Sequence, residues 1–176
     1  AADPQIRDKV RGLVFFGGYY DIFDYLESLV TRRSAFKDTT IDWQPAEGPV
    51  TYAVEVLTAK NAEGILKTLK AETSEEFRTL FKSVKKEEIT GLEKISPSES
   101  INNFKARIFI LHDKSDVYVP YLESAKLNEA LPNGVNKTYL LVNLFEHVQP
   151  KKGFSFEIIG EFVKLYGFLY QAISYL

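Results

Sequence analysis

The amino-acid sequence predicts an α/β fold built on a parallel sheet. Three short apolar runs, rich in β-branched and aromatic residues, indicate buried strands at residues 10–16, 107–112 and 137–145. One helical segment with short joints connects the second run to the third, which is typical of a right-handed parallel crossover. Helical signals dominate residues 22–95, which separate the first strand from the second. The 176 residues, of which 45% are hydrophobic, fit one domain with a substantial core.

The first strand has the sequence VRGLVFF and stops at a Gly-Gly pair, residues 17–18. The insertion that follows, residues 22–95, carries few strand signals. Thr73 and Glu76 have the spacing of a capping box at the start of a helix. We expect this insertion to be helical and to belong to the single domain 1–176.

The second strand, RIFILH, leads into the segment VPYLESAKLNEALPNG, whose apolar residues have helical spacing. Pro132, Asn133 and Gly134 are expected to stop this helix before the third strand, KTYLLVNLF. The tail, residues 156–176, repeats apolar residues on a wide helical face. We expect that face to pack on the core, and a membrane-surface helix is the alternative. The face comprises Ile159, Phe162, Val163, Tyr166, Leu169, Tyr170 and Ile173.

Composition argues against several classes of protein. The net charge is −2 and no long basic run occurs, so we expect no nucleic-acid partner. Cysteine is absent, and the two histidines lack metal-ligand spacing, so we expect no metal and no cofactor. No apolar run is long enough to span a membrane, so we expect a soluble protein. The sequence does not determine its compartment, and the cytoplasm is the preferred expectation. The chain contains no Met and opens AADPQIRDKV, so we expect a fragment or a processed chain.

Polar residues follow all three predicted strands. The first strand leads into residues 17–21, GGYYD, the second into HDKSD at 112–116, and the third into FEH at 145–147. Ligands of open parallel sheets bind at the carboxyl ends of the strands, so these loops should meet at one edge. We expect Gly18, Tyr19 and Tyr20 to line a substrate pocket, although aromatic residues in such places often pack under a lid.

Asp116 and His147 are the candidate catalytic residues. A histidine exchanges protons at neutral pH, and a neighbouring carboxylate can fix its tautomer, as in a nucleophile-activating triad. Asp21, which follows the first strand, is the second candidate for the acid. In the simpler interpretation His147 is a loop histidine and Asp116 caps a helix.

A longer block of sequence adds specificity to this pair. The residues SPSESINNFKARIFILHDKSDVYVPYLESAKLNEALPNG, followed by TYLLVNLFEH, resemble the C-terminal part of the α/β-hydrolase fold family. Ser96-Pro97, Asp116, Val119-Pro120 and His147 stand in the order of that family's motifs. The opening ADPQIRDKVRGLVFFGGYYD resembles the segment that follows the family's nucleophile helix.

The resemblance implies a fold class, namely the C-terminal portion of an α/β-hydrolase-like parallel sheet with a helical lid insertion. It also implies that Asp116 is the triad acid and His147 the triad histidine. Asp113 departs from the family, which usually has Gly there, but Asp tolerates a left-handed turn. No G-x-S-x-G elbow occurs in the 176 residues, so we expect the nucleophile Ser and the oxyanion donors upstream of Ala1.

Two functions follow from these observations. The first is the C-terminal part of a serine hydrolase that cleaves an ester or amide, as esterases, lipases and peptidases do, and that is inactive without its upstream segment. The second is a non-catalytic, hydrolase-like binding or interaction protein. The expected partners are a small-molecule ester or amide, and either the upstream half of the domain or a second copy that pairs at the open sheet edge.

Overall fold

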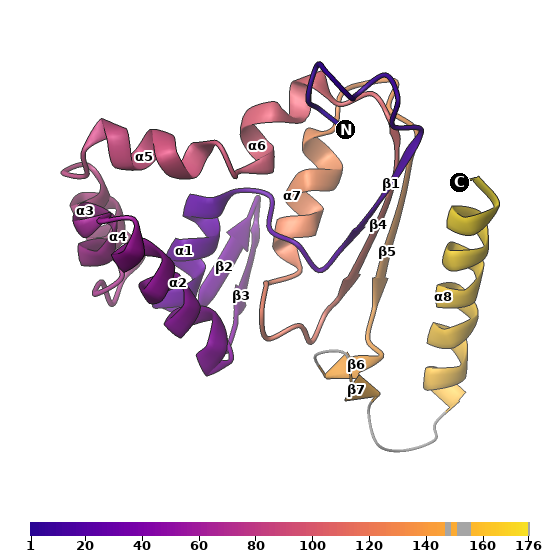
Figure 1. The fold of residues 1–176 in the computed structure, drawn as a ribbon. Coiled ribbons are helices and arrows are strands. Elements are labelled where there is room, and N and C mark those ends of the chain that lie inside the picture. Colours follow the sequence, from indigo (N-terminus) through magenta and orange to yellow (C-terminus); the bar gives the residue numbers. More distant parts are fainter. Residues whose placement is uncertain (147–148, 151–155, 176) are drawn as a thin grey trace. The chain divides into compact units, whose positions relative to one another are not determined.

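The computed structural model describes residues 1–146, 149–150 and 156–175. The chain divides into two compact units, which are coloured by sequence position in Figure 1. Ala1–Tyr20 and Pro97–Leu176 form one of them, here called the sheet unit. Asp21–Ser96 form the other, here called the insertion unit. The insertion unit spans the same stretch of chain as the insertion expected at residues 22–95, and its role as a lid stays a prediction.

The sheet unit contains a three-stranded parallel sheet, as the sequence predicts. Its strands are β1 (Gly12–Phe16), β4 (Arg107–Asp113) and β5 (Lys137–Val142), in the order β1-β4-β5. Both pairings are parallel, with Phe15 opposite Ile110 and Ile110 opposite Tyr139. The central strand β4 is buried on both faces, which explains why its sequence is apolar without alternation.

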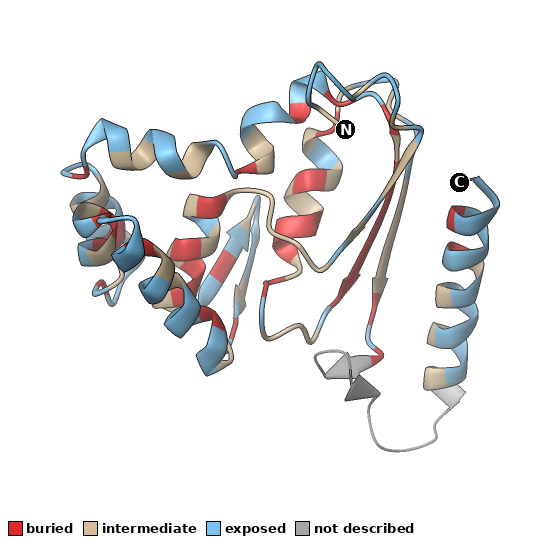
Figure 2. Cartoon of the chain, in the orientation of Figure 1, coloured by how far each residue is buried: buried red, intermediate tan, exposed pale blue. Residues whose placement is uncertain are grey.

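Two helices cover the two faces of this sheet (Figures 1 and 2). Helix α7 (Leu122–Ala130) begins and ends close to the predicted limits, before Pro132, and its Leu127 packs on Ile108 and Ile110. Helix α8 (Phe156–Tyr175) covers the opposite face. Two short helices, α6 (Pro97–Ser100) and the 3-10 turn η1 (Ile101–Asn103), lead into β4.

The third predicted strand ends earlier than expected. Strand β5 stops at Val142, and Phe145–Glu146 (β6) pairs antiparallel with Gln149–Pro150 (β7) as a separate ribbon. The chain leaves the sheet because the backbone N–H of Leu144 donates to the Asp113 carboxylate, at 2.8 Å, instead of continuing a strand ladder. The prediction of one strand over 137–145 is therefore wrong at its end.

Helix α8 is present where the sequence predicts it, but the prediction of its buried face is wrong. Phe168 and Ala172 are buried against the sheet, and Ile158 and Leu165 pack beside them. The residues predicted to face the core are 42–73% exposed: Ile159, Phe162, Val163, Tyr166, Leu169, Tyr170 and Ile173. The apolar arc of this helix is wider than the part in contact with the sheet, so periodicity alone did not distinguish the two faces.

The insertion unit is mainly helical. Its helices are α1 (Ile22–Thr31), α2 (Glu47–Ala59), α3 (Glu63–Thr68), α4 (Ser74–Phe81) and α5 (Lys86–Glu93). Thr73 is the N-cap of α4 and accepts from the Glu76 N–H at 3.2 Å, whereas the Glu76 carboxylate accepts from the Glu72 N–H. The bond from the Glu76 N–H to the Thr73 hydroxyl confirms the first bond of the predicted capping box. In the second bond the Glu76 carboxylate accepts from the N–H of Glu72 instead of that of Thr73.

A β-hairpin in the insertion unit was not predicted. Strands β2 (Arg33–Phe36) and β3 (Thr39–Asp42) pair antiparallel across a turn in which Lys37 has φ +52°. These strands are four residues long and mostly exposed, so they lack the apolar run that marks a buried strand.

Candidate functional site

The carboxyl ends of the parallel strands bring three loops together in the sheet unit. Gly17, directly after β1, has φ +59°, and a Cβ built on it would lie 3.1 Å from Asp116 Oδ2. Ser115 Oγ, after β4, donates to Asn143 Oδ1, after β5, at 2.9 Å. These contacts place Asp116 at the loop edge expected from the parallel topology.

The Asp116 carboxylate is held by the backbone of its own loop. Its Oδ1 accepts from the N–H groups of Tyr118, at 2.7 Å, and Val119, at 3.1 Å. The side chain is 14% exposed. Helix α7 has Tyr121 as its N-cap residue, so the interpretation of Asp116 as a helix cap is wrong. These two bonds instead fix the orientation of the carboxylate at the sheet edge.

Asp113 has a structural role that the sequence did not indicate. The residue is the last one of β4, with extended backbone, so the expected left-handed turn is wrong. Its carboxylate is buried and accepts from the N–H groups of Ser115, at 2.7 Å, and Leu144, at 2.8 Å. A glycine could not make these bonds, so the Asp113 carboxylate joins the loop after β4 to the segment after β5.

His112 is a buried strand-end residue, in agreement with its position in the sequence. Its Nε2 donates to the Val119 carbonyl at 3.0 Å and lies 3.7 Å from Asp116 Oδ2. Its Nδ1 is buried and has no hydrogen-bond partner among the residues that the structure describes. Burial lowers the pKa of His112, although the Val119 carbonyl and the carboxylates of Asp116 and Asp113 act in the opposite direction. The Nε2–H group therefore joins the end of β4 to the loop that carries Asp116.

The three predicted pocket residues occupy the loop after β1. A Cβ on Gly18 would lie 2.7 Å from the Phe15 ring, so any side chain at this position would displace that ring. Burial raises the pKa of Tyr19. Tyr20 packs against the core beneath α7, and its N–H donates to the fully buried carboxylate of Glu123 at 3.0 Å. Glu123 could not be predicted as a site residue, because a Glu between apolar helix positions carries no distinctive signal. A substrate-binding role of Gly18, Tyr19 and Tyr20 stays a prediction.

His147 lies outside the described residues, so its pairing with Asp116 stays a prediction. Asp21, the second candidate acid, is the N-cap of α1 and accepts from the N–H groups of Phe23 and Asp24. Its carboxylate thus already has a structural function at the start of a helix.

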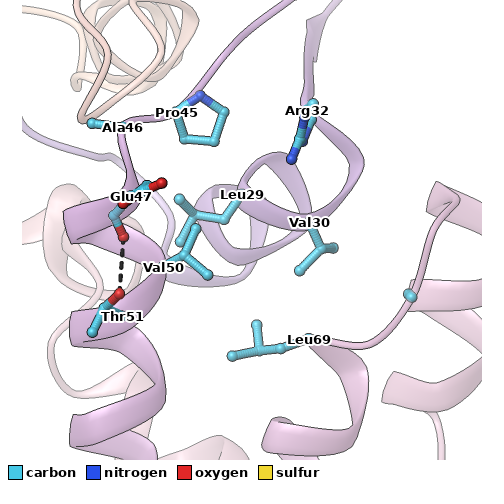
Figure 3. A pocket seen from close by; sticks show the side chains of 10 residues that line it. Leu29, Val30, Arg32, Pro45, Ala46, Glu47, Val50, Thr51 and Leu69 are labelled. Carbon is cyan, nitrogen blue, oxygen red and sulfur yellow. Dashed lines mark hydrogen bonds between the residues drawn. The ribbon is translucent and has the colours of Figure 1, made fainter.

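A separate pocket lies within the insertion unit (Figure 3). Its volume is about 430 Å³, and its walls come from the end of α1, the start of α2 and the segment after α3. Most of the lining is aliphatic, and Arg32 and Glu47 supply charge: Leu29, Val30, Arg32, Pro45, Ala46, Glu47, Val50, Thr51, Leu69 and Ala71. The residues concerned are far apart in the sequence, so no local pattern predicted this pocket.

Neither a metal site nor a membrane-spanning helix occurs among the residues that the structure describes. Across residues 1–146, 149–150 and 156–175, no three His, Asp or Glu side chains gather in a way that could hold a metal ion. Within the same residues, no helix has the length and apolar content needed to cross a bilayer. Comparisons with protein-family models, curated proteins and solved structures give no match for this chain.

Proposed function

We propose that this chain supplies the acid and the base of a serine-type acyl hydrolase of the α/β-hydrolase kind. Asp116 is the acid and His147 the base, and the nucleophile Ser comes from a segment outside these 176 residues. The observation that carries the proposal is the Asp116 carboxylate, which is held by two backbone N–H groups at the carboxyl end of a parallel sheet. That is where α/β enzymes place catalytic groups.

In the proposed reaction the Ser hydroxyl attacks the carbonyl carbon of an ester or amide. His147 takes the hydroxyl proton and then returns it to the leaving group, while Asp116 keeps the imidazole in the required tautomer. His147 then takes a proton from a water molecule, whose oxygen attacks the acyl carbon. The bond to the Ser oxygen breaks, and His147 returns the proton to that oxygen. The insertion unit is proposed to act as the lid that selects the substrate.

The open edge of the sheet supports the need for a further segment. Among the described residues, β1 pairs with β4 alone, so its other edge presents backbone groups for pairing. Val14 and Phe16 of β1 are 43% and 52% exposed. A nucleophile-bearing strand, or a second copy of the chain, would complete the sheet at this edge.

The test uses protein expressed from its complete open reading frame, a fluorophosphonate probe that labels active serines, and a panel of activated esters and amides. We expect labelling and hydrolysis. His147→Ala and Asp116→Asn should lower the rate by about 10³- to 10⁶-fold, as in other triads. Asp116→Asn keeps the oxygen that accepts from Tyr118 and Val119, so the loop should remain folded.

Asp21→Asn serves as the matched comparison, because Asn caps a helix about as well as Asp. If Asp21→Asn abolishes activity and Asp116→Asn does not, the acid has been assigned to the wrong residue. If the complete protein is neither labelled nor active on the panel, the hydrolase proposal is wrong and the non-catalytic binding protein takes its place.

A further inference from the structure

Helix α8 has an exposed apolar face that is separate from its contact with the sheet. Seven residues form this face, here called the outward stripe: Ile159, Phe162, Val163, Tyr166, Leu169, Tyr170 and Ile173. They are 42–73% exposed, whereas Phe168 and Ala172 on the neighbouring face are buried. Exposed residues, in pale blue, predominate along α8 in Figure 2.

The outward stripe is free of charge. Glu161 and Lys164 of the same helix pair with each other at 2.6 Å outside the stripe, and residues 165–175 contain no charged side chain. Tyr166 and Tyr170 stack within the stripe, with ring centroids 6.4 Å apart. Contiguous apolar patches on monomeric proteins rarely exceed a few hundred Å², so a stripe of this kind marks an interaction surface.

The area of the outward stripe matches one half of a stable interface. A fully exposed large apolar side chain has a surface of about 200 Å², so the exposed fractions of the seven residues amount to roughly 800 Å². Two such stripes in contact would remove about 1,600 Å² from water, the usual size of a specific protein–protein interface.

The spacing of the stripe is symmetric about its centre. On each side of Tyr166, apolar residues follow at three, four and seven positions along the helix. An antiparallel pair of α8 helices with a two-fold axis at Tyr166 therefore places Ile159 opposite Ile173 and Phe162 opposite Tyr170. Alternating steps of three and four also give knobs-into-holes packing between helices. In an isologous dimer both subunits use the same surface, and that surface must match itself across the two-fold axis.

We propose that a second copy of this chain covers the outward stripe, with the two α8 helices packed antiparallel across Tyr166. This interface is distinct from pairing at the β1 edge and is independent of the hydrolase proposal. Interfaces of this size have dissociation constants of micromolar or lower, so the dimer should be visible at ordinary protein concentrations.

The first experiment is sedimentation equilibrium of the 176-residue chain and two variants. Tyr166→Lys places two like charges at the two-fold axis and should raise the dissociation constant at least about 100-fold, because a central anchor is removed in both copies. Tyr52→Lys, on α2, is the matched control: Tyr52 is 69% exposed and Tyr166 is 71% exposed. It should leave the dimer unchanged. Circular dichroism confirms that both variants are folded.

A second experiment tests the orientation without altering the stripe. The chain contains no cysteine, so Gly160→Cys and Ser174→Cys each introduce a unique thiol. In the antiparallel pair, Cys at 160 of one copy and 174 of the other lie about 3 Å apart along the axis, whereas two copies of 174 are about 24 Å apart. A short bis-maleimide should therefore cross-link a mixture of the two variants but not Ser174→Cys with itself.

Several results would overturn the proposal. A strictly monomeric chain, or a dimer that persists in Tyr166→Lys, excludes the stripe as the interface. A dimer lost on Val14→Lys but kept in Tyr166→Lys assigns the contact to the β1 edge. A monomer that co-sediments with phosphatidylglycerol vesicles through Tyr166 shows that the stripe binds a lipid surface. Cross-linking of Ser174→Cys with itself shows a different arrangement of the helices.

Discussion

Replacement of Asp113 by Ala should destabilise the sheet unit more than the loss of an ordinary surface acid. Asp113 is 3% exposed, and its carboxylate accepts from the backbone N–H groups of Ser115 and Leu144. In Asp113→Ala both groups lose their acceptor within the fold. An unsatisfied buried donor costs about 1–3 kcal/mol, and the Ser115 group is closer to solvent, so we expect a loss of about 2–4 kcal/mol. Asp113→Asn retains one acceptor oxygen and should lose about half as much.

The assay is urea unfolding followed by circular dichroism, combined with amide hydrogen exchange. The Leu144 amide should lose protection in Asp113→Ala because its hydrogen bond is removed. Asp42→Ala is the control: Asp42 pairs with Arg33 at 3.1 Å, but its side chain is 81% exposed. Exposed ion pairs contribute at most about 1 kcal/mol. If both substitutions change the free energy of unfolding equally, or if Leu144 exchange is unchanged, the role assigned to Asp113 is wrong.

Three further predictions concern pH, backbone strain and helix capping. Because burial lowers the pKa of His112 in the folded chain, its contribution to stability is complete above about pH 6.5 and is lost as the pH falls toward the folded-state value. Urea midpoints measured between about pH 7.5 and 5 should therefore fall less steeply in His112→Gln than in the unaltered protein. Gly17→Ala should lower the free energy of unfolding more than Gly134→Ala. Both glycines have positive φ, where an alanine is strained by about 1 kcal/mol, but only alanine at position 17 would bring a Cβ to 3.1 Å from Asp116. Equal thermal shifts of the two would contradict the contact. Thr73→Ala should lose about 1 kcal/mol of unfolding free energy, and Thr73→Ser should lose little, because Ser caps the helix equally well. A loss of the same size in both variants would show that the hydroxyl cap has no effect.

The elements with strong local signals were predictable. Strands β1 and β4 lie within or next to their predicted ranges, because each is an uninterrupted apolar run bounded by polar residues. The prediction that both are buried holds for β4 alone, since Val14 and Phe16 of the edge strand β1 are exposed. Helix α7 ends before Pro132, since proline removes a backbone donor and restricts the residue that precedes it. The order strand, helix, strand then required a parallel pair.

The position of the candidate site was predictable from the sequence, but the hydrogen bonds that hold its loops together were not. Asp116 follows β4 in the sequence, and parallel strands necessarily place their carboxyl ends at one edge. The residues that hold this edge together were not apparent. Asp113 meets Leu144, 31 positions away, and Glu123 meets the N–H of Tyr20, 103 positions away. Such contacts leave no trace in the neighbouring sequence.

The sequence by itself determined which segments become strands of the parallel sheet and which become its main helices, because hydrophobic period, caps and stop residues act over a few neighbouring positions. Tertiary structure alone decided which side of α8 meets the sheet. Both of its apolar stripes satisfy the helical period, but Phe168 and Ala172 contact the sheet while Tyr166 and its neighbours remain exposed. That choice depends on β4 and β5, which are distant in sequence. It was reached by packing between remote segments and not by any preference of the helix itself.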